Sequence, residues 1–80
     1  MIQRVYAPIY IYAREAVIHH VDLDKENFVV YFEESIVGDS IKYLFFKYEP
    51  GDSPEYGADF VNAVKQDGKT YLIFVKEFHA

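Results

Sequence analysis

The sequence predicts an α+β domain in which a mainly antiparallel sheet of about five strands carries one helix, in the order β-β-β-β-α-β. Several segments alternate between apolar and polar residues with the period of two that is typical of strands. One segment, residues 53–67, changes to a helical spacing, and turn-forming residues separate the segments. This order is compatible with a twisted sheet that has the helix packed on one face, or with a small half-open barrel plugged by the helix.

The first strand segment runs from Ile2 to Ala13, and its two parities differ in chemistry. A pleated strand would bury the aliphatic parity and expose an aromatic, basic stripe. Pro8 cannot donate a ladder hydrogen bond, so the segment is either two short strands joined by a kink or an edge strand with Pro8 facing outward. The exposed parity contains Arg4, Tyr6, Tyr10, Tyr12 and Arg14, and the buried parity contains Val5, Ala7, Ile9, Ile11 and Ala13.

The next two strand segments form a predicted hairpin. Apolar and polar residues alternate from Ala16 to Leu23, which predicts the first strand of the hairpin. The polar quartet 24–27 forms the turn, and Phe28 to Glu33 forms the second strand. Gly38 then marks a second turn, because glycine accepts the backbone angles that turns require. Ile41 to Tyr48 is apolar or aromatic on both parities, so we expect it at a central position of the sheet.

The predicted helix begins after a loop that contains Pro50 and Gly51. Ser53 can cap the helix and Pro54 suits its first turn. Gly68 follows Asp67 as a C-terminal cap, and Thr70 to Phe78 forms the last strand. The face that would pack on the sheet contains Tyr56, Phe60, Ala63 and Val64.

Length and composition predict one domain over residues 1–80. With 51% hydrophobic and 19% aromatic residues, the chain has enough apolar surface to build one core, and 80 residues leave no room for a second. The absence of cysteine excludes disulfides, thiolate nucleophiles and zinc-thiolate sites. It also suits a reducing compartment, so we expect a cytoplasmic protein.

The formal net charge is -5 and the sequence pI is near 5.0. This charge disfavours long-range attraction to duplex DNA and to an anionic membrane, and it favours a basic surface on a larger protein. In addition, no segment approaches the roughly 18 uninterrupted apolar residues of a membrane span. We therefore expect a protein partner and no membrane partner.

No motif predicts catalysis, a metal or a cofactor. The serines lie at turn or cap positions without a nucleophile-elbow motif, so we expect no catalytic residue and no enzyme. Glu33 and Glu34 would diverge as neighbours in a strand, and His19 and His20 would point to opposite faces.

One acidic pattern has a metal-binding alternative. Residues 22–33 place acids at spacings similar to those of an EF-hand calcium loop. Asn27 stands where that loop needs glycine, and both flanks alternate like strands instead of helices. We therefore interpret these acids as a solvated hairpin tip and expect no metal.

The resulting hypothesis is a non-enzymatic protein-binding module that occupies a partner surface, as an inhibitor or adaptor. Tyrosine and arginine are enriched at binding hot spots, and acids accelerate association with a basic surface. This profile resembles that of proteins encoded by phages and mobile elements, including anti-CRISPR proteins, and the resemblance rests on no motif. The resemblance implies the cytoplasm of a bacterial or archaeal cell, for a protein encoded by that cell or by a virus. The predicted partner-binding residues are Arg4, Tyr6, Tyr10, Tyr12, Arg14, Asp22, Asp24, Glu26, Glu33 and Glu34.

Three alternatives remain open at this point. The tyrosine and arginine stripe could bind single-stranded nucleic acid such as RNA, with rings stacking on bases and cations holding phosphates. The stripe could also pair two copies of the chain into a homodimer through an edge strand. Finally, the tyrosines could cover a second hydrophobic layer of the protein itself.

Overall fold

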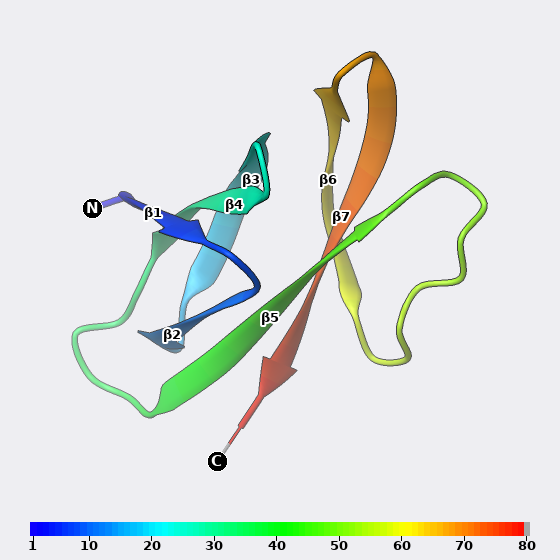
Figure 1. Ribbon diagram of the computed structural model, residues 1–80. Coiled ribbons are helices and arrows are strands. Elements are labelled where there is room, and N and C mark those ends of the chain that lie inside the picture. Colours follow the sequence, from blue (N-terminus) through cyan, green and yellow to red (C-terminus); the bar gives the residue numbers. More distant parts are fainter. Residues whose placement is uncertain (80) are drawn as a thin grey trace.

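The computed structural model describes residues 1–79, and over these residues it contains seven strands and no helix (Figure 1). The described chain measures 40 × 26 × 17 Å along its principal axes. The strands are β1 (Gln3–Ala7), β2 (Tyr10–Arg14), β3 (Val17–Asp24), β4 (Asn27–Glu33), β5 (Ser40–Tyr48), β6 (Asp59–Gln66) and β7 (Lys69–Phe78).

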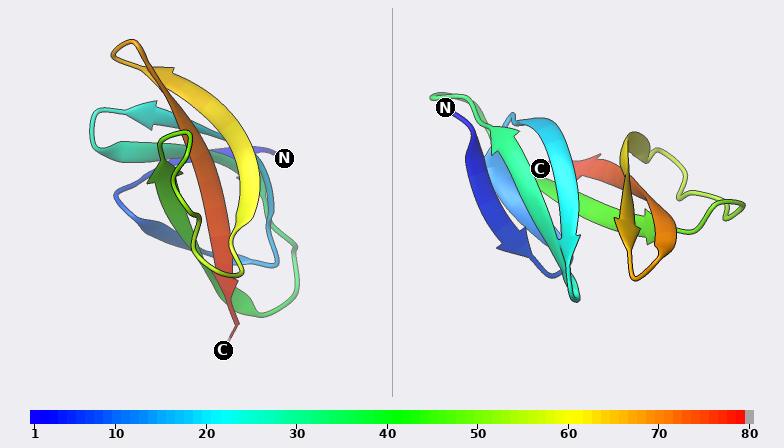
Figure 2. Two further views of the ribbon diagram at one scale, coloured as in Figure 1. Left: turned by 90° about the vertical axis from the view of Figure 1, so that its right-hand side faces the viewer. Right: turned by 90° about the horizontal axis from the view of Figure 1, so that it is seen from above.

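The strands form two antiparallel sheets instead of the single sheet or plugged barrel expected. A three-stranded sheet has the order β1-β4-β3, and a four-stranded sheet has the order β2-β5-β7-β6. Seen from above, β1, β3 and β4 lie on one side of the molecule and β6 and β7 on the other, and β5 crosses between them (Figure 2). The chain passes from one sheet to the other at Pro8 and Ile9, so the first segment is two short strands, each at the edge of its sheet.

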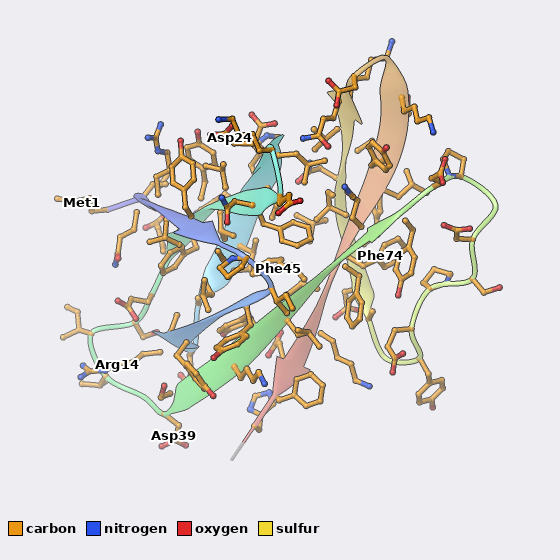
Figure 3. All side chains as sticks on the ribbon, in the orientation of Figure 1. Met1, Arg14, Asp24, Asp39, Phe45 and Phe74 are labelled. Carbon is orange, nitrogen blue, oxygen red and sulfur yellow. The ribbon has the colours of Figure 1, made fainter. Side chains whose placement is uncertain are left out.

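The core lies between the inner faces of the two sheets. Phe28 of β4 and Phe45 of β5 meet there with ring centroids 5.7 Å apart, and Figure 3 shows Phe45 near the centre of the molecule. Tyr43 is also buried, and its hydroxyl oxygen accepts a hydrogen bond from the Ala16 N–H at 2.6 Å. Burial raises the pKa of Tyr43, so the phenol stays neutral and fixes the connection between β2 and β3.

Amide side chains join the two sheets where β3 runs beside β6, at a boundary that we call the β3–β6 seam. The Asn62 side chain of β6 accepts a hydrogen bond from the Val21 N–H at 2.9 Å and donates one to the Val21 carbonyl at 2.8 Å. Four residues further along β6, the Gln66 side chain donates a hydrogen bond to the Lys25 carbonyl at 3.1 Å. The seam therefore satisfies backbone groups of β3 without a backbone ladder.

The helix predicted over residues 53–67 is wrong. Residues 59–66 form β6, which pairs with β7 through a two-residue turn at Asp67 and Gly68. Both turn residues have positive φ, of 53° and 79°, as the type I′ hairpin turn requires. Asp-Gly is thus a hairpin signal here and not a helix cap, and the strand-forming Phe60 and Val64 pair with β7 instead of coiling.

The other predicted strands are confirmed with small changes at their ends. β3 and β4 form the expected hairpin, and the residue with positive φ in its turn is Lys25. β5 is central, since it lies between β2 and β7, and this position explains why it is apolar on both parities. β7 is the second central strand of the same sheet.

Candidate functional site

The candidate site of this protein is a surface. No pocket is present among residues 1–79, and within that range no group of three or more histidine, aspartate or glutamate side chains converges as metal ligands would. The acids of the calcium-like pattern are spread along a hairpin, where the Asp22 carboxylate accepts a hydrogen bond from the Leu23 N–H at 2.9 Å. The exposed aromatic residues are therefore the features that call for a functional explanation.

The predicted tyrosine and arginine stripe is exposed, but the chain divides it between two sheets. The side chains of Tyr6 and Tyr12 are 51% and 63% exposed, so within this chain they do not cover a second hydrophobic layer. Arg4 and Tyr6 lie on β1, whereas Tyr10, Tyr12 and Arg14 lie on β2. On the opposite parity Ala7 and Ala13 are buried, Val5 and Ile11 are partly buried, and Ile9 is exposed against expectation.

We call the outer face of the three-stranded sheet the three-strand face. Residues directly opposite one another in neighbouring strands point to the same side of a sheet. Val29 of β4 stands opposite Tyr6 of β1 and opposite Asp22 of β3, and this places all three on one side. The face contains Arg4, Tyr6, His20, Asp22, Val29 and Tyr31.

Charge changes sign across the three-strand face. At the β1 edge the Arg4 guanidinium carbon lies 5.4 Å from the centre of the Tyr6 ring. In the middle, the rings of His20 and Tyr31 are 5.9 Å apart. At the β3 edge stands Asp22, and Figure 3 shows Asp24 at the end of the same strand, away from Arg14. Glu26 continues the acidic edge into the hairpin turn.

The other two predicted acids, Glu33 and Glu34, form hydrogen bonds with other residues of the chain. Glu33 lies 2.8 Å from the His19 ring nitrogen, and this hydrogen bond lowers the pKa of the Glu33 carboxyl. Glu34 accepts hydrogen bonds from the Arg14 N–H at 2.9 Å and from the Gln3 amide at 3.1 Å, which lower its pKa. Glu34 therefore ties the start of β1 to the end of β2.

We call the outer face of the four-stranded sheet the four-strand face. Its members follow from the ladder register, as for the first face. They are Tyr10, Tyr12 and Arg14 on β2; Ser40, Lys42, Leu44, Phe46 and Tyr48 on β5; Thr70, Leu72, Phe74, Lys76 and Phe78 on β7; and Phe60, Ala63 and Lys65 on β6. No member of this set is acidic.

Aromatic rings contact one another across the four-strand face. Phe46 and Tyr48 stack with centroids 5.8 Å apart, Tyr48 meets the edge of Phe74 at 5.5 Å, and Phe74 meets Phe60 at 5.5 Å. Phe60 remains 57% exposed at the end of this chain of rings. Closer to β2, Tyr10 and Tyr12 contact edge to face at 5.4 Å. Such contacts hold the rings in fixed orientations.

Lysines lie over these rings. The Lys42 ammonium is 4.6 Å from the centre of the Tyr10 ring, and the Lys76 ammonium is 5.3 Å from that of Phe78. Both distances are typical of cation–π contacts. The long β5–β6 loop borders the face, since the Glu55 N–H donates to the Tyr48 hydroxyl at 2.8 Å and the Glu55 carboxylate lies 3.4 Å from the Lys76 ammonium.

Sequence reasoning missed most of the four-strand face. The sequence pattern attributes Phe46 to the two-sided burial of a central strand and Phe60 to the packed face of a helix. The signal that could have found them is the Asp67-Gly68 hairpin turn, because pairing β6 with β7 places Phe60 opposite Phe74.

Comparisons with protein-family models, with curated proteins and with solved structures found no match for this chain. Within the described residues, no helix has the length and apolar character that crossing a membrane requires. The two outer faces are therefore the candidate functional surfaces of this protein.

Proposed function

We propose that this protein is a non-enzymatic protein-binding module that acts by occupying the surface of a larger protein, as an inhibitor or adaptor. The observation that carries the proposal is the register of β4, which places Tyr6 and Asp22 on either side of Val29 on one face. A basic surface of the partner faces the acidic β3 edge, while Tyr6 and Tyr31 supply apolar contact.

The three-strand face has the features of a binding hot spot with an acidic rim. Tyr6 offers a large ring on a rigid strand, and tyrosine loses little conformational entropy on binding. Arg4 beside it can bond a carboxylate or stack on a ring of the partner. Asp22, Asp24 and Glu26 are exposed, so their main contribution is faster association with a basic surface, and this contribution is screened by salt.

The lack of cysteine supports a cytoplasmic setting as part of this proposal. Because no cysteine can form a disulfide, folding and binding proceed unchanged under reducing conditions. The binding experiments below are therefore designed for reducing buffer.

The test is affinity capture of the protein partner by the full chain, with one variant on each face. Tyr6→Ala removes the hot spot of the three-strand face, and Tyr12→Ala is the matched control, because both tyrosines are exposed on edge strands. We expect a protein that the wild type and Tyr12→Ala retain at low salt, that Tyr6→Ala loses, and that Asp24→Asn retains less well. Retention that Tyr6→Ala leaves unchanged, or the absence of any retained protein, contradicts the proposal.

A further inference from the structure

We propose that the four-strand face is a second binding site, whose ligand is single-stranded nucleic acid. This site is separate from the surface that the proposed function uses, so the two proposals succeed or fail independently. The inference depends on three properties of the face: its local charge, its ring geometry and the acidic loop residue that borders it.

The local charge of the four-strand face is opposite to that of the whole chain. Its charged members are Arg14, Lys42, Lys65 and Lys76, and all four are cationic. The acids of the protein lie elsewhere, mostly on turns and loops such as 24–26 and 49–55. Because the Debye length at physiological salt is only about 8 Å, a ligand on this face meets the local cations more than the net charge of the chain.

The rings of the face are arranged as platforms on which bases can stack. Tyr10 and Tyr12 form one ring pair beside Lys42 at the β2 edge. On the same face, Phe46, Tyr48, Phe74 and Phe60 form a connected row from β5 to the β6 edge. A single strand alternates flat bases with phosphates, so one ligand can occupy rings and cations together.

This combination distinguishes a single strand from other anions. Duplex DNA keeps its bases stacked within the helix and cannot offer them to the rings. An acidic peptide could pair with Lys42 and Lys76, but it would leave the exposed rings of Tyr12 and Phe60 without flat partners. An acidic peptide is therefore included as a competitor in the test.

Glu55 provides a test of the charge argument in which a substitution should strengthen binding instead of weakening it. Its carboxylate lies 3.4 Å from the Lys76 ammonium, so it competes with any phosphate for that lysine. The substitution Glu55→Gln keeps the backbone N–H that donates to the Tyr48 hydroxyl and removes the competing charge. We therefore expect Glu55→Gln to bind the oligonucleotide several-fold more tightly.

The experiment is fluorescence anisotropy of the full chain with labelled oligothymidylate and oligouridylate of about twelve nucleotides, within the usual site size of single-strand binders. We expect wild-type binding at low salt and about a tenfold loss in Tyr12→Ala, which is the usual effect of removing one stacking ring. The matched control Tyr6→Ala on the three-strand face binds like the wild type.

Four results would overturn the proposal. They are no binding of either oligonucleotide at 50 mM salt, equal losses in Tyr6→Ala and Tyr12→Ala, no gain in Glu55→Gln, and displacement of the oligonucleotide by polyglutamate at matched charge concentration. The last result would identify a general anion surface instead of a nucleic-acid site. Stronger binding of one oligonucleotide supports the proposal and identifies the preferred sugar.

Discussion

The two outer faces of this protein share one core but differ in what accompanies their aromatic rings. On the three-strand face, Tyr6 and Tyr31 lie between Arg4 at one edge and Asp22 at the other. On the four-strand face, the rings are accompanied by cations such as Lys42 and Lys76. The difference teaches that a net charge of -5 describes the whole chain and does not describe the local charge of either face.

The difference follows from where the acids fall along the chain. Strand positions that face outward on the four-stranded sheet are aromatic, apolar, hydroxyl-bearing or basic, and acids gather in the hairpin turn 24–26 and the β5–β6 loop. Single substitutions can therefore change one face without changing the other, and so test whether the two faces act separately or together.

The largest effect is expected from the core that both faces share. Ile73 is fully buried between the sheets, and Ile73→Ala should lower the free energy of unfolding by about 2–5 kcal/mol through lost burial and a residual cavity. Chemical denaturation should show one transition in which both binding activities are lost together. Ile36→Ala is the control, because Ile36 is 90% exposed and its loss should leave stability unchanged. Two separate transitions would show that the sheets unfold independently.

A smaller loss of stability is expected at the β3–β6 seam. Asn62→Ala leaves the N–H and carbonyl of buried Val21 without their partners, at a cost of about 1–3 kcal/mol. Gln66→Ala, at the exposed end of the same seam, should change stability by about 0.5 kcal/mol or less. Equal effects of the two substitutions, measured by urea denaturation, would contradict this account of how the sheets are joined.

Salt dependence separates the charges of the two faces. If Lys42 neutralises a phosphate, Lys42→Gln should reduce the slope of log K against log salt by about 0.7 for a single strand. Arg4→Gln, on the three-strand face, should leave the slope of oligonucleotide binding unchanged. Anisotropy titrations from low to moderate salt measure both slopes, and a similar change in the two variants would count against separate faces.

The smallest effect is expected from pH. The pKa values of Glu33 and Glu34 are lowered in the folded chain, so their contribution to stability is present above the ordinary carboxyl pKa of 4.5 and is lost as the pH falls through the lowered values. Melting temperatures measured from pH 7 downward should stay level and then decline below about pH 4.5. Glu34→Gln should make that decline shallower, and an unchanged decline would show that Glu34 contributes nothing.

The sequence predicted the parts of the fold that depend on local pattern. Alternation located the β3–β4 hairpin, apolar residues on both parities located the central β5 and the final β7, and Pro8 marked the break between β1 and β2. These predictions succeeded because burial on one or both sides of a strand leaves its own period in the residues. The exposure of Tyr6 and Tyr12 followed from the same parity argument.

The sequence could not show how strands far apart in the chain meet. A helical reading of residues 53–67 satisfied capping and spacing, and only pairing with β7 selects the strand. The Asn62 contacts with Val21 join residues 41 positions apart, and no local pattern indicates them. The division of the tyrosine stripe between two faces likewise depends on which sheet each short strand joins.

The most direct test of the account is an NMR titration of the isotope-labelled chain with the single-stranded oligonucleotide, following each backbone amide. The account predicts that chemical-shift changes concentrate on β5 and β7 of the four-strand face, at Lys42, Phe46, Phe74 and Lys76. The amide signals of Val29 and Tyr31 on the three-strand face should not shift. Shifts that centre on Val29 and Tyr31, or no shifts at saturating oligonucleotide, would contradict it.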